Sequence, residues 1–484
     1  MSEIANDRMK NLRTQLFIDN QWVDSVAGER FETVDPSNET VIGTVSRARA
    51  EDIDLAARAA SRAMQGSWPK LAPAERGKVL FKLADLIDAN SHDLAKLETI
   101  DVGKPLSGSL GDIAGVSDTV RYNAGAADKL EGTTIPIGPD HFDFSVMEPI
   151  GVTGHIMPWN YPLGMAARSV APALAAGCSV ILKPAEQSPL STLAFAELCE
   201  EAGFPSGVVN VVPGFGDEAG AALTSHPLVR GITFTGSVAT GRAVYQSAAL
   251  GLKKVVLELG GKNPLIVFPD ADLDQAANDA VVGAYANSGQ VCSSSSLLFL
   301  HEDIREDFLV RFTEISKKLT VGGGMDDRDL GPIASSEQYD RVRSFLDGVR
   351  DRGARVLFGG GRPSNMDSGY FIEPTLVECL DVGQPIAREE VFGPVAVAIA
   401  FTDQKAVVEM ISDLDYGLVA GIYTRDISRA LRLASEIDAG TIWINGWYIG
   451  GAQVPTGGNK ASGIGRERGL PGIANYLELK NVGI

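Results

Sequence analysis

The sequence predicts an α/β fold built on parallel β-sheets, because short apolar segments alternate with helical stretches in two successive series. The first series runs from Val152 to Leu257, and the second begins at Pro264 and reaches Ile444. Continuous apolar strands separated by helices are typical of a parallel sheet that is covered on both faces. Sheets of this kind bind ligands at the carboxyl ends of their strands.

Helical patterns come first along the chain. Between Glu51 and Gly103, apolar residues recur at helical spacing, whereas Asp140–Glu148 alternates apolar and polar residues as a strand does. The strands expected in the first series are Val152–Met157, Ser179–Leu182, Val208–Val212, Ile232–Thr235 and Val255–Leu257. The helices expected between and beside them are Leu163–Ala176, Leu190–Ala202, Asp217–Thr224 and Val238–Ala249.

The second series continues the alternation, with glycine-rich loops at Gly322–Gly324 and Gly359–Gly361. Its expected strands are Leu265–Phe268, Leu297–Leu300, Arg355–Phe358, Val395–Phe401, Gly421–Tyr423 and Thr441–Ile444. The tail Asn475–Val482 predicts one more short strand, which has no local partner. Such a strand pairs either with a neighbouring subunit or with another part of the same chain.

Composition and charge limit the possible functions. The chain has 484 residues, with 43 Lys or Arg against 62 Asp or Glu, so its net charge is −19. Nucleic-acid-binding surfaces need clustered cations, and no block of basic residues is present. We therefore expect neither nucleic acid nor an anionic membrane as a partner. At about 150 residues per domain, the length suggests about three domains.

Several features favour a reducing cytoplasm. The Met1–Lys10 segment is polar and does not resemble a signal peptide. No apolar run reaches the roughly 18 residues that a membrane span requires. The four cysteines are widely spaced and form no CxxC pair, and the five histidines also lie far apart. These spacings predict neither a disulfide framework nor a metal site.

Cys292 is the candidate nucleophile. It follows Gly289-Gln290-Val291 and precedes a run of serines, so small polar neighbours leave its sulfur accessible. A thiolate attacks carbonyl groups well once its proton has been removed. From local context alone, Cys292 can equally well be interpreted as a nucleophile or as an inert cysteine. For Cys178, Cys199 and Cys379 we expect inert, buried thiols.

Glu258 is the candidate general base, because it ends the apolar strand Val255–Leu257 and precedes Gly260 and Gly261. Burial of a carboxylate at that position is costly unless the group is paired or protonated. A raised pKa would suit a base. The alternative is a salt bridge to Lys262 or a strand-end cap. The two glycines permit close backbone approach and favour the catalytic interpretation.

Other polar residues follow strands of the first series. Asn160, between Trp159 and Tyr161, is expected either to donate its amide to an oxyanion or to cap a helix. The segment Phe234-Thr235-Gly236-Ser237 follows a strand and opens a helix, where free N–H groups suit a phosphate. Lys183 and Glu186 either hold ribose hydroxyls or form an exposed ion pair.

Taken together, these motifs resemble the aldehyde dehydrogenase superfamily over nearly the whole chain and in the family's order. Further matches are Glu390-Val391-Phe392-Gly393-Pro394 and the stretch Pro455–Glu467. The resemblance implies that Cys292 attacks the aldehyde to give a thiohemiacetal, and that Asn160 stabilises its oxyanion. Hydride transfer to a nicotinamide would then leave a thioester, which Glu258 hydrolyses by activating water. Glu467 matches a position that assists proton relay in some members.

The resemblance also implies a cofactor, NAD, with NADP possible because some relatives with the equivalent of Glu186 accept it. The residues expected to bind the cofactor are Ile156, Pro158, Trp159, Lys183, Glu186, Gly216, Gly220, Phe234, Gly236, Ser237, Thr240, Leu259, Glu390 and Phe392. Among these, Lys183 and Glu186 would contact the adenine ribose, Ser237 the pyrophosphate and Glu390 the nicotinamide ribose.

The expected substrate residues are Tyr161, Met165, Arg168, Val291, Ser293 and Thr456. Many relatives with simple aliphatic substrates carry Phe, Trp and Phe where this chain has Tyr161, Arg168 and Thr456. These changes add polar groups, and both semialdehyde and hydroxybenzaldehyde dehydrogenases can carry an arginine at position 168. We therefore expect a polar-substituted aldehyde, either hydroxy-aromatic or a semialdehyde. Arg168 pointing to the subunit surface remains an alternative, as does a simple aliphatic substrate.

The intact Glu258 favours hydrolysis over transfer to coenzyme A, because coenzyme A-acylating relatives tend to lack this base. A non-catalytic protein on the same scaffold would be expected to lose the nucleophile or the base. The resemblance implies three parts: a Rossmann-type NAD-binding domain of residues 1–124 and 149–259, an α/β catalytic domain of residues 260–467, and a small β oligomerisation element of residues 125–148 and 468–484. We expect a homodimer or homotetramer.

Overall fold

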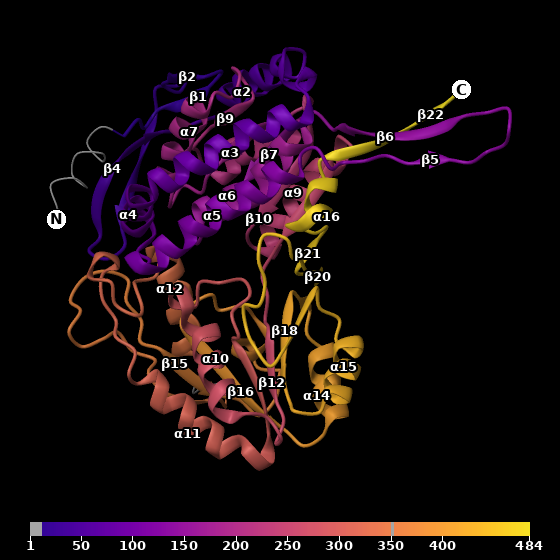
Figure 1. Cartoon of the computed structure of the whole chain (residues 1–484). Helices are drawn as coiled ribbons and strands as arrows, with labels where there is room; N and C mark the ends of the chain where they lie inside the picture. Colours follow the sequence, from indigo (N-terminus) through magenta and orange to yellow (C-terminus); the bar gives the residue numbers. More distant parts are fainter. Residues whose placement is uncertain (1–11, 350–352) are drawn as a thin grey trace.

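The computed structural model describes residues 12–349 and 353–484, so the polar Met1–Lys10 segment lies outside the described residues. The chain forms two large parts, each with its own sheet, and an arm that projects from the upper part (Figure 1). Over the described ranges, no helix combines the length and the apolar character that crossing a membrane requires.

The sheet of the upper part contains eight strands in the order β2-β1-β9-β8-β7-β10-β11-β21 among the described residues. Their bounds are β1 (Leu16–Ile18), β2 (Gln21–Val23), β7 (Val152–Ile156), β8 (Ser179–Lys183), β9 (Val209–Val211), β10 (Val229–Thr235), β11 (Lys254–Glu258) and β21 (Gly463–Ile464). The central strands, β9-β8-β7-β10-β11, run parallel. The chain leaves β7 toward β8 on one side and later returns to β10 on the other, which creates the switch point where such sheets bind ligands.

Helices cover both faces of this sheet, as the continuous apolar strands predicted. They are α2 (Ala50–Ala63), α3 (Pro73–Ala89), α4 (Ser91–Val102), α5 (Leu106–Ala126), α6 (Pro162–Ala176), α7 (Leu190–Ala202), α8 (Ala221–Ser225) and α9 (Val238–Leu250). Alternate residues of β8 enter the two cores: Val180 packs with Leu163 and Leu193 on one face, and Ile181 packs with Ile53 on the other.

The lower sheet has the order β14-β15-β16-β13-β12-β18-β19. Its strands are β12 (Pro264–Val267), β13 (Leu297–His301), β14 (Arg355–Phe358), β15 (Thr375–Glu378), β16 (Val395–Phe401), β18 (Val419–Tyr423) and β19 (Thr441–Ile444). Its helices are α10 (Leu273–Tyr285), α11 (Arg305–Ser316), α12 (Ser336–Asp347), α13 (Pro385–Arg388), α14 (Gln404–Ser412) and α15 (Ile427–Glu436). Apolar cores again lie on both faces.

One strand differs from the predicted parallel series. The pattern at Arg355–Phe358 forms β14, but this edge strand runs antiparallel to β15. No helix lies between Phe358 and Thr375 in this described stretch. Without a crossover helix the chain turns back beside itself, and that connection gives an antiparallel pair.

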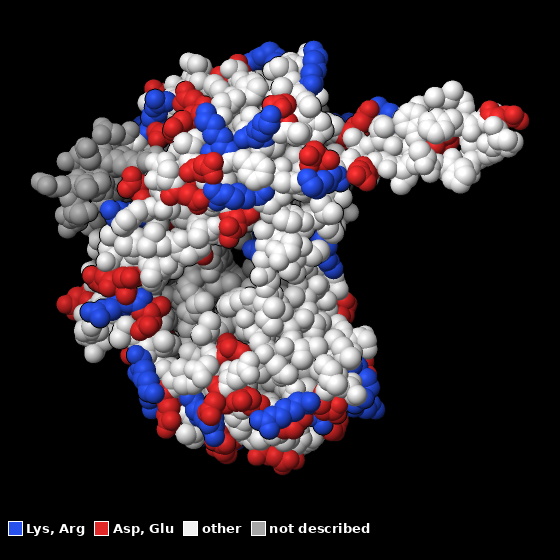
Figure 2. Space-filling view, viewed as in Figure 1, with Lys and Arg blue, Asp and Glu red and all other residues white. Residues whose placement is uncertain are grey.

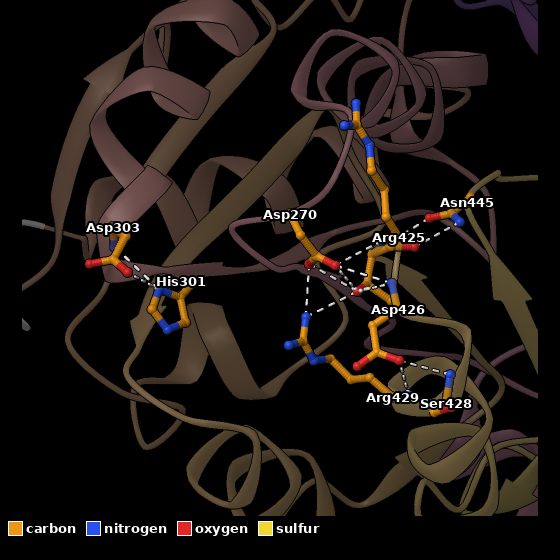
Figure 3. Close-up of polar contacts among 9 residues, drawn as sticks. Asp270, His301, Asp303, Arg425, Asp426, Ser428, Arg429 and Asn445 are labelled. Carbon is orange, nitrogen blue, oxygen red and sulfur yellow. Dashed lines mark hydrogen bonds and ion pairs between the residues drawn. The ribbon is translucent and has the colours of Figure 1, made fainter.

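A polar cluster fixes one end of the lower sheet (Figure 3). Asp270, just beyond β12, accepts hydrogen bonds from the Thr424 hydroxyl, from the Arg425 and Asp426 amides and from Arg429. These donors follow β18, so one carboxylate joins the carboxyl ends of two neighbouring strands. The candidate active site described below lies at the opposite, amino end of β12.

The arm is a three-stranded antiparallel sheet with the order β22-β6-β5. Its strands are β5 (Thr134–Ile135), β6 (Asp143–Pro149) and β22 (Leu477–Gly483). The predicted tail strand therefore pairs with its own chain, along the whole of β6. The remaining small elements are β3 (Arg30–Asp35), β4 (Thr40–Ser46), β17 (Tyr416–Gly417), β20 (Asn459–Lys460) and α16 (Gly469–Ala474).

Candidate active site

A cleft of about 810 Å³ opens at the carboxyl ends of β7, β8 and β10. The molecular surface is hollowed between the upper and lower parts (Figure 2). Both parts contribute to the cleft, since Ser335 and Gln338 line it from the lower part. The predicted cofactor residues that line it are Ile156, Pro158, Trp159, Lys183, Glu186, Gly216, Gly220, Phe234, Gly236, Ser237 and Thr240.

The amino end of α9 faces this cleft. Ser237 caps the helix, because its Oγ accepts a hydrogen bond from the Thr240 amide at 3.2 Å. A Cβ on Gly236 would lie 2.6 Å from the Phe234 ring, and a Cβ on Gly241 would lie 2.5 Å from Leu259. The two glycines therefore let the helix start close to its strand. Such a helix end offers N–H groups to a phosphate, as the sequence predicted.

Lys183 and Glu186 meet at the end of β8. The Lys183 side chain is buried, and its Nζ lies 3.2 Å from Glu186 Oε2 and 2.9 Å from the Pro184 carbonyl oxygen. Burial lowers the pKa of Lys183. The pair is thus not a freely exposed ion pair, and its position in the cleft fits a ligand with hydroxyl groups. The carboxylate of Glu186 would repel a phosphate placed on those hydroxyls.

The other predicted cofactor residues surround the inner end of the cleft. The rings of Trp159 and Phe392 meet edge to face at 5.3 Å. Glu390 accepts a hydrogen bond from the Gly261 amide at 3.0 Å, and burial raises the pKa of Glu390 to about 7. Leu259 packs against Gly241 of α9. These contacts join the cofactor cleft to the loop that follows Glu258.

The loop before Cys292 has an unusual backbone. Asn287, Ser288 and Gly289 have φ values of 47°, 54° and 72°, so three successive residues adopt the left-handed conformation. The Gln290 side chain holds this turn, because its Oε1 accepts from the Ala334 amide at 2.9 Å. Cys292 itself is partly exposed, unlike the three buried cysteines. Burial of the sulfur raises the pKa of Cys292 to about 11.

Asn160 lies against this loop. Its side chain is buried, and its Nδ2 donates to the Gln290 carbonyl oxygen at 2.8 Å. The helix that follows Asn160, α6, is capped at Tyr161 without a side-chain hydrogen bond, so the helix-cap interpretation of Asn160 is wrong. An amide group has two N–H donors, and one of them remains for an oxyanion near Cys292.

Glu258 ends β11 with its carboxylate buried, and burial raises its pKa to about 8. The Glu258 Oε1 atom has no hydrogen-bond partner. The alternative of a salt bridge to Lys262 is wrong, because Lys262 Nζ donates to the Ile386 carbonyl oxygen. A buried carboxylate with a raised pKa and a free oxygen has the properties of a general base.

The two glycines after Glu258 allow the backbone to pass close to the segments that contain Glu390 and Cys292. A Cβ on Gly260 would collide with the Glu390 carboxylate, and a Cβ on Gly261 would lie 2.8 Å from the Cys292 carbonyl oxygen. The backbone after Glu258 therefore passes between the cofactor cleft and the cysteine loop. Cys292, Asn160 and Glu258 therefore lie close together, and a thiol, an amide donor and a carboxylate in one place would suit acyl chemistry.

Arg168 does not point to the subunit surface, because it is only 8% exposed. Its Nε forms an ion pair with the Glu467 carboxylate, and its NH2 group lies 3.8 Å from Glu258 Oε2. Burial would lower the pKa of Arg168, but the charges of Glu467 and Glu258 raise it above its ordinary value. The surface alternative is therefore wrong, and the guanidinium faces two buried carboxylates.

Tyr161 and Thr456 contribute further polar groups, Tyr161 beside Lys104 and Thr456 beside Glu467. Lys104 Nζ lies 3.9 Å from the centre of the Tyr161 ring and forms an ion pair with Glu98. The Thr456 hydroxyl is buried and has no hydrogen-bond partner, while its backbone exchanges two hydrogen bonds with Glu467. Of the other predicted substrate residues, Val291 is buried, Ser293 is half-buried and Met165 packs at the edge of the upper core.

Sequence reasoning missed Tyr448 and Arg468. Tyr448 is 37% exposed overall, but desolvation of its hydroxyl group raises its pKa, and the nearby charges of Tyr161 and Cys292 raise it further. Arg468 has a left-handed backbone, and its Nε is buried without a hydrogen-bond partner. Neither residue belongs to a motif with a recognisable spacing. Only the fold brings them to the site.

Known proteins resemble this chain over nearly its whole length. The sequence model of the aldehyde dehydrogenase family matches residues 22–482. The chain is 42% identical over 471 residues to hydroxyisobutyraldehyde dehydrogenase of Mycolicibacterium austroafricanum, which covers 97% of this chain and 93% of the relative.

Two solved structures resemble the fold over nearly its full length. An NAD⁺ complex of aldehyde dehydrogenase from Bacillus cereus superposes with a TM-score of 0.97 at 41% identity, covering 100% of this chain and 98% of that one. An NAD⁺ complex of betaine aldehyde dehydrogenase from Staphylococcus aureus has a TM-score of 0.97 at 39% identity, with 99% and 97% covered.

Proposed function

The chain belongs to the aldehyde dehydrogenase family, and we propose that it oxidises a polar-substituted aldehyde to the carboxylic acid with NAD⁺. The observation that supports this proposal is the proximity of Cys292, Asn160 and Glu258: Asn160 bonds the loop just before Cys292, the backbone after Glu258 approaches the Cys292 carbonyl group, and the charge of Glu258 acts on the Cys292 thiol. Catalysis of this kind needs a nucleophile, an oxyanion donor and a base within one enclosed site.

The cleft residues fit NAD. The capped amino end of α9 suits the pyrophosphate, and Lys183 with Glu186 suits the hydroxyls of the adenine ribose. Glu390 would hold the nicotinamide ribose, with Trp159 and Phe392 beside it. Bound NAD⁺ supplies a hydride acceptor. Glu186 favours NAD over NADP, because its carboxylate would repel a 2′-phosphate.

We propose that the Cys292 thiolate attacks the carbonyl carbon of the aldehyde to form a thiohemiacetal. The Asn160 amide and the Cys292 backbone N–H would stabilise the negative oxygen. Loss of hydride from the former aldehyde carbon converts this adduct to a thioester on Cys292. Glu258 then removes a proton from water, which attacks the thioester and releases the acid and the free thiolate.

The polar groups at the substrate end support a hydroxy-substituted aromatic aldehyde more than a semialdehyde. The Thr456 hydroxyl is buried without a partner, so it can bond a neutral polar substituent. Tyr161 and Tyr448 supply aromatic rings near Cys292. The Arg168 guanidinium is already paired with Glu467, which leaves it less available to a substrate carboxylate. Two relatives, named for hydroxyisobutyraldehyde and betaine aldehyde, also act on polar-substituted aldehydes.

A substrate panel tests this proposal. The values of kcat/KM for a hydroxybenzaldehyde, succinate semialdehyde and acetaldehyde are measured by NADH absorbance, with and without coenzyme A. We expect the hydroxybenzaldehyde to be preferred without any coenzyme A requirement. A clear preference for acetaldehyde would overturn the substrate proposal. Product formation only with coenzyme A would overturn hydrolysis.

A cysteine exchange tests the reaction class separately. Cys292→Ala should abolish oxidation of every aldehyde and leave NAD binding intact, as measured by calorimetric titration. The matched control is Cys199→Ala, because Cys199 is buried in α7 and belongs to no site. Turnover retained by Cys292→Ala would refute the nucleophile assignment.

We also propose the domain division and assembly that the sequence suggested. Residues 1–124 and 149–259 would bind NAD, residues 260–467 would carry the catalytic cysteine, and residues 125–148 with 468–484 would join subunits in a homodimer or homotetramer. The arm supports this last role. It projects from the body (Figure 1) and carries exposed apolar side chains at Ile137, Phe142 and Leu479.

A further inference from the structure

Arg168 lies on α6, the helix that begins just after Asn160. A buried arginine needs partners for its charge, and the structure provides two carboxylates from distant segments. Glu258 comes from the end of β11, and Glu467 comes from the loop that leads to α16. The side chains of all three residues are at most 9% exposed.

The two carboxylates are held differently. Glu467 forms the close ion pair with Arg168 Nε, and its backbone is fixed by hydrogen bonds in both directions with Thr456. Glu258 lies at 3.8 Å from Arg168 NH2, and its Oε1 has no hydrogen-bond partner. Glu467 is therefore the closer partner of the guanidinium and Glu258 the more distant one, although neither Glu467 Oε2 nor Glu258 Oε1 has a hydrogen-bond partner.

Several charged groups face Glu258. Arg168 faces it from α6, and the segment after β21 contributes Arg466, Glu467 and Arg468. Arg466 donates to the carbonyl oxygens of Gly458 and Gly465 and is thus engaged elsewhere. Among the described residues, Arg168 is the cation that forms an ion pair with Glu258.

Cys292 faces the same guanidinium. After burial, which raises the pKa of Cys292, the charge of Arg168 is the next cause and lowers it. One cation thus acts on both the nucleophile and the base.

We propose that Arg168 is a positioning residue that orients the Glu258 carboxylate and stabilises its charged form for thioester hydrolysis, and that Glu467 competes with Glu258 for the same guanidinium. The inference rests on the proposed role of Glu258 as the base. It replaces the expectation that Arg168 binds the substrate, because the guanidinium already faces two carboxylates.

The charges of Arg168 and Glu467 shift the pKa of Glu258 in opposite directions. Burial raises the pKa of Glu258, the charge of Arg168 lowers it, and the charge of Glu467 raises it. Arg168→Met should therefore raise the apparent pKa of hydrolysis further. Glu467→Gln removes a like charge and leaves Arg168 to Glu258 alone, so it should lower that pKa. If Arg168 and Glu467 had only a structural role, the two variants would not shift the apparent pKa in opposite directions.

The test measures kcat against pH for the full-length enzyme, with NADH burst kinetics to separate hydrolysis from hydride transfer. For Arg168→Met we expect the apparent pKa to rise by about one unit and kcat at pH 7 to fall about tenfold. For Glu467→Gln we expect a fall of about half a unit and a rise in kcat at pH 7 of about threefold. Arg168→Lys should restore part of the wild-type profile.

Arg76→Met is the matched control, because Arg76 is a buried arginine on α3 whose NH1 group donates to the Leu71 carbonyl oxygen. Its pH profile should match the wild type. An increase in KM for polar aldehydes in Arg168→Met, with the profile unmoved, would overturn the proposal in favour of substrate binding. If Arg168→Met does not fold, an unmoved or upward-shifted profile in Glu467→Gln overturns it alone. Failure of the wild type to form NADH from any aldehyde would instead refute the proposed function.

Discussion

The Cys292 thiol depends on its neighbours for reactivity. Burial raises the pKa of Cys292 to about 11, so the resting thiol holds its proton at neutral pH. Glu258, whose pKa burial raises to about 8, is a nearby group that can accept that proton. The same burial that weakens the nucleophile therefore strengthens the base. Desolvation of the reactive group is the largest cause of the pKa shift in both residues.

Glu258→Gln should slow thioester hydrolysis by about a hundredfold or more, because a neutral amide cannot take a proton from water. In the wild type only the carboxylate form acts. Its fraction falls about tenfold per pH unit below the pKa of about 8, so hydrolysis should slow as pH decreases through that value. Stopped-flow NADH formation checks this: in Glu258→Gln the burst should be slower, because Glu258 also accepts the Cys292 proton, and the turnover after the burst should be slower still.

The control for this variant is Glu186→Gln, which changes a carboxylate at the cofactor end and should keep the wild-type pH profile. A hydrolysis rate in Glu258→Gln equal to that of the wild type, at any pH, would remove Glu258 from the role of base.

Candidate site residues with local signals could be proposed from the sequence. Cys292, Glu258 and Asn160 each follow a strand or turn whose pattern is visible, and their motifs support one another. The partners of Arg168 were not predictable, because Glu258 and Glu467 reach it only through tertiary packing. Tyr448 and Lys104 were missed for the same reason. Ion pairs between residues far apart in the sequence produce no recognisable pattern in the sequence.

At the scale of elements, the turn before Cys292 carries the tightest steric constraint on the site. Gly289 has a φ of 72°, and a Cβ at this position would collide with the Gly393 carbonyl group. Gly393 belongs to the segment that also contains Phe392 of the cofactor cleft. The turn before Cys292 is therefore packed directly against the segment that is proposed to bind the cofactor.

Gly289→Ala should destabilise the protein by about 2 kcal/mol or more, because it combines a strained backbone with a backbone collision. We also expect a large loss of kcat, since the cysteine loop must move. Thermal unfolding and steady-state kinetics measure the two effects.

Gly115→Ala serves as the comparison for that exchange. Gly115 is exposed within α5, and a Cβ there would meet nothing within 4 Å. This change should stabilise the helix by up to about 1 kcal/mol and leave kcat unaltered. Equal unfolding temperatures for the two variants would contradict the steric argument.

Most of the parallel strands were predicted, because each is a continuous apolar run with buried residues on both faces. The strand β15, which runs parallel to β16, was not predicted. The strands β1 and β2 were not predicted, since three residues are too few to establish an alternation. The direction of β14 was also predicted incorrectly. Strand direction depends on the connection to the next strand, and the pattern within the strand does not encode it.

At the scale of the whole molecule, the arm is the part least able to stand alone. A sheet of three strands that projects from the body buries little of its own apolar surface. Phe142 and Leu479 are 53% and 65% exposed, and they lie on neighbouring segments of the arm. A second copy of the chain is the proposed cover for this surface.

Leu479→Asp should weaken self-association, because it places a charge in the proposed contact. Light scattering after size-exclusion chromatography would then give a smaller mass than for the wild type at equal concentration. Leu380→Asp is the control, since Leu380 is 84% exposed but lies in the lower part, away from the arm. An unchanged mass for Leu479→Asp, or an equal change for both variants, would remove the arm from the interface.

The burial of Cys292 also bears on how long the enzyme survives. Peroxides oxidise thiolates much faster than protonated thiols, so a thiol that keeps its proton between turnovers is slow to form sulfenic acid. The raised pKa of Cys292 should therefore slow the oxidation of the resting thiol by peroxide. Cys292 would be open to oxidation only during the part of the catalytic cycle in which its proton has been transferred to a base. The Cys292 side chain is thus protected from oxidation while it is protonated and becomes reactive only while it is a thiolate.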